Sequence, residues 1–518
     1  MPYAHYERLS ALDTTFLEVE DDNAHMHVGA VSMFEAAPLL QADGTLDIEQ
    51  IRHFVESSIH RIPRYRQRLD TIPVFGSHIW VDDNRFNLNY HVRHVGLPYP
   101  GDERLLKRLA GRIMSQKLDR GKPLWELWVV EGVAGDKVAM INKAHHCLTD
   151  GVGSVQLLSA LMRPMPQQRR DVEEHHRWLP RPAPRKGDLF RSELTRRITE
   201  PLSVLSSATS AVMDPIGSVE KLRASILGVG EALRPGLRPA SPTPLNTDIG
   251  PHRRFDWLTM DLSTVKAVKN QLGGTVNDIV LAIVSGALRR FLRSRGLRVD
   301  DLDFRAMIPV NFRAETDRAN LGNRITMMVA NLPVDERDPR ARLARVIEIT
   351  RDLKQSKQPS GIRTIEELAD LTLTTLFTAF SKLSSRSRAY NVVVTNVPGP
   401  QYPIYFLGAQ MQSVFPLVPL SQDQALGIAL FSYNNALFWG FNSDWDAVPD
   451  LHDVVKSIES EFRHLQDAAA GGPVEIRSSD EPKARTSTRR AGKRTMPKRM
   501  TPSAEAESRG NGVDRRAR

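Results

Sequence analysis

The strongest constraint on the fold is that the apolar residues form two patterned blocks separated by proline-rich stretches. Each block alternates runs with the two-residue period of a strand and runs with the roughly 3.6-residue period of a helix. Proline recurs within residues 163–188 and 238–251, which favours connecting segments there. The sequence therefore predicts domains at 1–165 and 251–468, joined by a connecting region at 166–250.

The expected elements indicate an α/β fold with mixed sheets that are covered by helices. We expect strands at residues 26–34, 78–81, 125–133, 137–146, 255–262, 304–310, 325–332, 390–395, 426–433 and 436–441. We expect helices at residues 46–61, 103–117, 152–162, 263–272, 276–294, 339–355, 365–383 and 449–465.

Positive charge is concentrated at the end of the chain. The formal net charge is +9, and residues 471–518 hold 13 Lys or Arg against 6 Asp or Glu. Residues 1–470 are almost neutral, so a basic surface for specific nucleic-acid binding is not expected. The tail, placed at 469–518, has almost no large apolar residues and is predicted to be disordered. Weak contact of this tail with anionic lipid or RNA stays open beside a solvated tail without a partner.

The chain contains one cysteine, Cys147, which excludes an intramolecular disulfide and a cysteine-based metal cluster. The longest apolar runs, such as 279–288 and 425–431, are shorter than the roughly 18 to 20 residues that a membrane-spanning helix needs. Residues 1–16 lack the pattern of a secretory signal. We therefore expect a cytoplasmic protein.

Residues 137–151 read as a strand, a polar loop and the start of a helix, with a histidine pair at the end of the strand. His145 and His146 are expected on opposite faces, so only one can easily reach a given reacting atom. A neutral imidazole at that position can act as a general base. Packed or solvated histidines remain the alternative, and a metal site is disfavoured. Asp150 could cap the following helix, and Gly151 lets the chain turn.

Three other segments have structural and functional interpretations. Asp278 follows Asn277 at a helix start, where a carboxylate is favourable for stability alone. Pro123, Leu124 and Trp125 read as a turn into a strand, with the tryptophan in the core. Residues 396–400 read as a rigid turn that ends a strand.

Together these segments resemble a known family. Residues 145–151 match an HHxxxDG motif, 123–125 a PLW motif, 277–278 an ND motif and 396–400 an NVPGP segment, in the expected order. The combination is similar to the bifunctional wax ester synthase/acyl-CoA:diacylglycerol acyltransferase family over roughly residues 1–468. HHxxxDG alone would also admit peptide-synthetase condensation domains.

The resemblance implies two domains like chloramphenicol acetyltransferase, with the active-site tunnel at their interface. It implies His146 as the general base, His145 as motif support, and Asp150 as loop organiser beside Gly151. No cofactor or metal is implied, because acyl-CoA is a substrate. Further candidates for the substrate site, or for structural support of it, are Pro123, Leu124, Trp125, Asn277, Asp278, Thr395 and Asn396.

The implied reaction moves a long-chain fatty acyl group from CoA to the hydroxyl of diacylglycerol, which gives triacylglycerol. Fatty alcohols are a second expected acceptor and give wax esters. Because such products are insoluble in water, we expect peripheral association with a membrane or lipid body. Two alternatives stay open: a condensation-type acyltransferase that uses a carrier protein, and a non-catalytic lipid-binding protein of the same fold. Chain length, oligomeric state and the oxyanion donor stay open as well.

Overall fold

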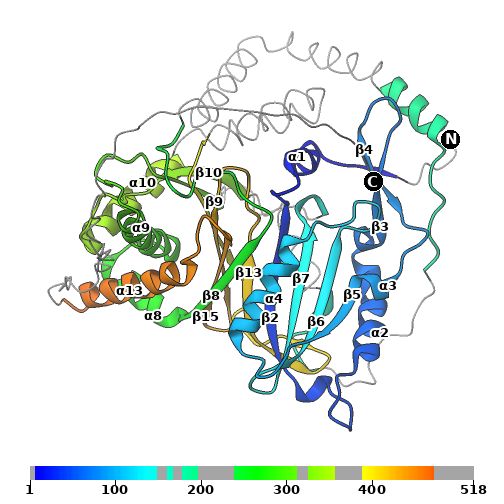
Figure 1. Cartoon of the computed structure of the whole chain (residues 1–518), viewed down its shortest axis with the longest axis horizontal. Helices are drawn as coiled ribbons and strands as arrows, with labels where there is room; N and C mark the ends of the chain where they lie inside the picture. The colour runs from blue at the N-terminus through cyan, green and yellow to red at the C-terminus, as the bar shows by residue number, and fades with distance from the viewer. Residues whose placement is uncertain are drawn as a thin grey trace, which may run out of the picture. The chain divides into compact units, whose positions relative to one another are not determined.

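The computed structural model describes residues 6–148, 160–166, 178–196, 239–311, 325–355 and 388–471. Residues 1–475 form one compact unit, and Figure 1 shows its two large sheets with their helices. The predicted helix at 365–383, most of the one at 152–162, the motif residues Asp150 and Gly151, and the tail beyond 471 lie outside the described residues.

The first large sheet has six strands in the order β12-β13-β2-β7-β6-β5. Only β5 and β6 are parallel neighbours. Apolar residues of α2 and α4, such as Phe54 and Leu106, are buried in the core of this sheet. The elements are β2 (His27–Glu35), α2 (Ile48–Ser58), β5 (Val92–Gly96), α4 (Glu103–Ser115), β6 (Trp125–Val133), β7 (Lys137–His145), β12 (Tyr405–Phe406) and β13 (Ala409–Leu417).

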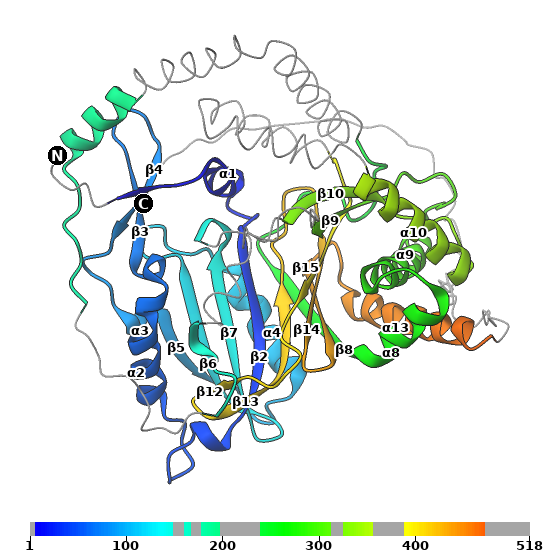
Figure 2. The same ribbon diagram turned by 180° about the vertical axis from the view of Figure 1, so that it is seen from behind.

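The second large sheet also has six strands, in the order β10-β9-β11-β14-β15-β8. Helices α8, α9, α10 and α13 lie on one side of it in Figures 1 and 2, and residues 279–284 of α9 are fully buried in its core. The elements are β8 (Arg253–Asp261), α8 (Leu262–Leu272), α9 (Val276–Ser294), β9 (Arg305–Asn311), β10 (Ile325–Asn331), α10 (Pro339–Gln355), β11 (Val392–Pro398), β14 (Leu426–Tyr433), β15 (Ala436–Asp444) and α13 (Leu451–Ala469).

No single helix among the described residues is apolar and long enough to cross a membrane, although α8 and α9, bent by 93°, meet that test as a pair.

Strand β13 connects the two halves of the chain. It follows β11 in sequence, yet it pairs antiparallel with β2, with Leu417 opposite Gly29 and Val414 opposite Ser32. The next strand, β14, returns to the second sheet. The predicted division into domains at 165 and 250 does not anticipate this exchange, because β12 and β13 extend a sheet built mostly from residues before 150.

A third sheet is small, with strands in the order β1-β4-β3. It consists of β1 (Glu7–Arg8), β3 (Gln67–Thr71) and β4 (His78–Asp82), and α1 (Ala11–Val19) follows β1 directly. Short helical turns complete the first half of the chain: η1 (Ala37–Leu39), η2 (Ile59–Arg61), η3 (Pro63–Arg66) and α3 (Leu88–His91).

Most predicted elements are present within a few residues of their expected bounds, and the mixed α/β class is confirmed. The sequence missed α1, β3, β5 and β13, which are short or lack a regular alternation. Strand β7 ends at His145, one residue earlier than predicted. The reason is local: the His146 N–H donates to the Met26 carbonyl at 2.8 Å, and a 3-10 turn, η4 (His146–Leu148), begins there.

Candidate active site

The histidine pair lies where β7 passes into η4. His145 is the last residue of the strand, pairs with His27 of β2, and is 1% exposed. His146 opens η4 and keeps partial exposure. The two side chains were predicted to point to opposite faces of one strand. Because η4 begins at His146, the two side chains instead lie in different surroundings.

The His146 ring contacts Phe16 of α1 face to face. The ring centroids are 3.9 Å apart and the planes differ by 26°. Burial lowers the pKa of His146 to about 4, and the hydrogen bond of the ring to its own backbone opposes this shift only in part. The imidazole is therefore neutral at pH 7, which is the protonation state that a general base requires.

His145 faces the interior. The Cys147 N–H donates to its Nδ1 at 3.2 Å, and the Cys147 sulfur lies 2.9 Å from the same nitrogen. Because Nδ1 accepts, the neutral ring carries its proton on Nε2, which lies 3.6 Å from Glu20 Oε2. Burial lowers the pKa of His145 and raises that of the Cys147 thiol well above its usual value. Neither group is an accessible nucleophile in this arrangement.

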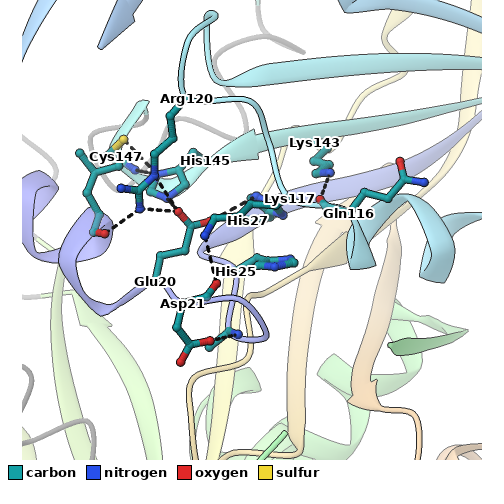
Figure 3. Close-up of polar contacts among 12 residues, drawn as sticks. Glu20, Asp21, His25, His27, Gln116, Lys117, Arg120, Lys143, His145 and Cys147 are labelled. Carbon is teal, nitrogen blue, oxygen red and sulfur yellow. Dashed lines mark hydrogen bonds and ion pairs between the residues drawn. The ribbon is translucent and has the colours of Figure 1, made fainter. Parts of the chain in front are cut away.

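Glu20 is the centre of a polar cluster that includes His145 and Arg120 (Figure 3). Its side chain is 1% exposed and accepts from Arg120 Nε at 3.1 Å and Nη2 at 2.5 Å. Burial alone would raise the pKa of Glu20, but the hydrogen bonds and charges of His145 and Arg120 lower it to about 2. Arg120 Nη2 also donates to the Leu17 carbonyl at 2.7 Å, so one guanidinium holds both the carboxylate and the end of α1.

Further buried basic side chains surround this cluster. The His27 ring centroid lies 5.2 Å from that of His25 and 6.2 Å from that of His145. Burial lowers the pKa of both His25 and His27. Lys143 is 1% exposed, donates to the Ile113 carbonyl at 3.0 Å, and has its pKa lowered to about 8 by burial.

The sequence analysis did not single out Phe16, Glu20, Arg120, His25 or His27. Phe16 lies outside the four motifs, and Arg120 precedes the PLW motif by three residues. Neither position has a spacing that predicts contact with residues 145–147. Only the folded chain brings them to the histidine pair.

The PLW motif is part of the core. Pro123 is buried, and Leu124 and Trp125 are 0% exposed. The Trp125 indole N–H donates to the Tyr65 carbonyl at 2.8 Å, and its ring stacks on His91 with centroids 4.6 Å apart. These contacts correspond to the structural interpretation of the motif.

The ND motif caps a helix. Asp278 Oδ2 accepts from the Thr275 N–H at 2.7 Å, and the Asp278 N–H donates to Thr275 Oγ1 at 3.2 Å. The other oxygen, Oδ1, accepts from Thr350 Oγ1 at 2.7 Å. This reciprocal capping box satisfies backbone groups at the start of α9. Asp278 is therefore engaged in local structure, while the neighbouring Asn277 keeps partial exposure.

Thr395 and Asn396 lie in β11, opposite Ala429 and Leu430 of the parallel strand β14. Asn396 shares a strand face with Val394, which is buried in the second core, and Thr395 lies on the other face. Both residues are partly exposed. Within the described ranges, no group of three or more His, Cys, Asp or Glu side chains is arranged to hold a metal ion.

Phe16 lies at the junction of the two halves. Its side chain packs against both large hydrophobic cores. Because its ring stacks on His146, that imidazole lies where the two cores meet. Two family models match the chain: the wax ester synthase/diacylglycerol acyltransferase catalytic domain over residues 9–280, and the C-terminal domain of that family over residues 321–466.

The chain belongs to the wax ester synthase/diacylglycerol acyltransferase family. The resemblance read from the motifs, and with it the prediction of an acyltransferase, is confirmed. A relative from Mycobacterium tuberculosis, named "probable diacylglycerol O-acyltransferase", is 31% identical and covers 88% of this chain and 95% of its own length. The O-acyltransferase WSD of Acinetobacter baylyi is 28% identical, and the match covers 89% of this chain and 97% of that relative's length.

Solved structures share the fold. The wax ester synthase/diacylglycerol acyltransferase of Marinobacter aquaeolei has a TM-score of 0.63 at 24% identity and covers 89% of this chain and 100% of its own. The first condensation domain of the calcium-dependent antibiotic synthetase has a TM-score of 0.55 at 16% identity. The match covers 90% of this chain and 96% of that domain. These likenesses agree with the predicted two-domain fold.

Proposed function

We propose that this acyltransferase moves a long-chain fatty acyl group from CoA to the hydroxyl of diacylglycerol, with His146 as the general base. Fatty alcohols are the second acceptor in this proposal. The observation that carries it is the His146 ring, which is neutral, partly exposed, and held where the two cores meet. The names of the relatives from Mycobacterium and Acinetobacter support the substrate class.

The proposed step needs no covalent acyl-enzyme. A nitrogen of the His146 imidazole accepts the hydroxyl proton while the hydroxyl oxygen attacks the thioester carbonyl carbon. The tetrahedral intermediate collapses, the carbon–sulfur bond breaks, and the imidazolium returns the proton to the CoA sulfur. General-base assistance of this kind contributes about 10² to 10⁴ in rate.

Other site residues have proposed supporting roles. Thr395, Asn396 and Asn277 are the candidates for the donor to the oxyanion, where one well-placed hydrogen bond is worth roughly 2.7 to 4 kcal/mol. Asp150 as loop organiser and Gly151 at the turn remain predictions. His145 lies in the interior with Nε2 toward Glu20. This position favours a structural role for that histidine over a chemical one.

We further propose a cytoplasmic enzyme that works at a membrane or lipid-body surface. The acceptor and the product are insoluble in water, so both must be exchanged with a lipid phase. The free thiol of Cys147 suits a reducing compartment. The apolar sequence stretches 201–213 and 222–233, which could lie on such a surface, fall outside the described residues. Flotation of the full chain with phospholipid vesicles tests this association.

Two rivals predict different results. A carrier-dependent condensation enzyme would use acyl groups on a carrier protein and ignore free acyl-CoA. A non-catalytic lipid-binding protein would show no turnover, and His146→Ala would leave its lipid binding unchanged. The match to both family models favours the CoA-dependent enzyme over the first rival.

The deciding experiment offers radiolabelled long-chain acyl-CoA to the purified full chain, with diacylglycerol and hexadecanol in parallel reactions. Thin-layer chromatography separates the products. We expect labelled triacylglycerol, a smaller yield of wax ester, and a loss of at least about 10²-fold in His146→Ala. His94→Ala, which changes an exposed imidazole paired with Glu131, is the control. Equal turnover in His146→Ala and the unmodified protein would refute the role of His146.

A further inference from the structure

Helix α1, which carries Phe16, is fixed at both ends. At its start, Ser10 Oγ accepts from the Asp13 N–H at 3.0 Å. At its end, Arg120 Nη2 donates to the Leu17 carbonyl at 2.7 Å. Between these points the helix contacts η4, the turn that begins with His146. A side chain on α1 therefore has a defined position relative to the histidine.

The contact between the Phe16 and His146 rings is a face contact. A centroid separation of 3.9 Å and an angle of 26° between the planes leave no room for water between the rings. Both nitrogens of an imidazole lie at the ring edge, so a phenyl group on the face leaves their hydrogen-bonding capacity intact. Such a partner can fix the plane of the ring without competing for its proton.

We propose that Phe16 is a positioning residue for the acyl transfer: its ring lies against the His146 imidazole and holds the plane in which that imidazole accepts the hydroxyl proton. This inference rests on the proposed function of His146. Its physical basis is that a base misplaced by about 1 Å can lose roughly 10²-fold in rate. Phe16 also packs against both cores, so its place is set by the two halves of the chain together.

His145, which ends β7, is the ionisable group whose charge acts on the pKa of His146. The neighbouring Cys147 of η4 is in turn affected by Asp13 and Glu20, from α1 and the segment after it, and by Arg120, which precedes β6. Glu20 and Arg120 pair with each other. Burial is the largest cause of the lowered pKa of His146. Removing the phenyl group would admit water to the imidazole face, and the pKa of His146 should then rise from about 4 toward 6.5.

The test compares Phe16→Leu, Phe16→Tyr and a control, Val19→Ala. Val19 is on the same helix and packs on the second core. We expect Phe16→Leu to lower kcat about 10- to 100-fold with little change in KM for acyl-CoA. The acid limb of its pH–rate profile should move toward pH 6.5. Phe16→Tyr keeps the aromatic face and should stay within about threefold of the unmodified protein, as should Val19→Ala.

A second measurement does not depend on turnover. The His146 signal in an NMR titration of histidine-labelled protein, assigned with His146→Gln, reports its pKa directly. We expect a higher pKa in Phe16→Leu and no change in Val19→Ala. An unchanged His146 pKa together with unchanged kcat in Phe16→Leu would overturn the inference. So would equal losses in Phe16→Leu and Val19→Ala that match their folded fractions. An inactive unmodified protein would instead refute the proposed function.

Discussion

Each half of the molecule buries a charged cluster, and the two clusters differ in how they respond to protons. The β7 cluster consists of Glu20, Arg120, His27 and His145, beneath the histidine motif. The α9 cluster consists of Arg290, Arg342 and Glu461, between α9, α10 and α13. In the first, burial lowers the pKa of the imidazoles, and in the second, two arginines pair with one carboxylate whose pKa is lowered to about 2.

The α9 cluster joins three helices. Arg342 is 1% exposed, donates from Nε to the Ala282 carbonyl at 3.0 Å, and pairs with Glu461. Glu461 also accepts from Arg290 Nε at 2.7 Å. A side chain at Gly286 would overlap both the Glu461 carboxylate and the Arg342 guanidinium, so the glycine makes room for the pair. Ion pairs between three helices form this cluster, whereas the β7 cluster combines one ion pair with buried imidazoles beside the proposed chemistry.

The largest expected effect comes from breaking the α9 cluster. Arg342→Ala leaves the Glu461 carboxylate buried without its closest cation, which should lower the free energy of unfolding by about 3 to 5 kcal/mol. Urea denaturation measures this change. Replacing both partners, with Arg342→Met and Glu461→Met together, should cost less, because no buried charge is then left without its partner. A larger loss in the double variant would contradict the argument.

The two clusters should change the stability of the protein over different pH ranges. Burial lowers the pKa of His27, so the unfolded chain binds its proton more readily and stability falls as pH drops below 6.5. His27→Leu should reduce this slope by up to about 1.4 kcal/mol per pH unit. Urea denaturation between pH 7 and 5 measures it.

Glu461 should affect stability over a different pH range. Burial would raise its pKa, but His464, Arg342 and Arg290 lower it to about 2, so its contribution to stability is lost only as pH falls from 4.5 toward 2. Glu461→Gln should therefore leave the slope between pH 7 and 5 unchanged. If it flattens that slope as His27→Leu does, the two clusters do not differ as described.

A smaller effect is expected from Arg120→Ala. The variant loses the hydrogen bonds to Glu20 and to the Leu17 carbonyl, but Arg120 is 38% exposed and water can replace part of them. We expect the free energy of unfolding to fall by about 1 to 2 kcal/mol. Turnover should fall by more than the loss of folded protein explains, because α1 holds Phe16. Lys122→Ala, which removes an exposed cation two residues away, is the control. Equal turnover in the two variants would contradict this role.

The smallest effect concerns the ND motif. Asp278→Ala removes the capping box of α9 and should lower the unfolding free energy by about 1 kcal/mol. Turnover per folded molecule should not change, since Asp278 is engaged with Thr275 and Thr350. A loss of kcat of about 10² with stability retained would show that the second half supplies chemistry as well as support.

Sequence alone determined the fold class and the place of the histidine pair. Strands such as β6 and helices such as α4 follow from local periodicity, because burial on one face imposes a period on the chain. The capping box at Thr275 and Asp278 was foreseen as a helix start because capping depends on neighbours in sequence. The family followed from four short motifs whose order is visible without a structure.

Tertiary structure decided which of these residues meet. The insertion of β13 beside β2 joins segments almost 400 residues apart, and no local pattern encodes such a partner. The same holds for Phe16 on His146 and for Arg120 on Glu20. Periodicity fixes which face of an element is buried, but only the packing of distant elements fixes what lies against that face. The protonation state of His146 depends on that packing, because burial by distant segments determines how much water reaches the imidazole.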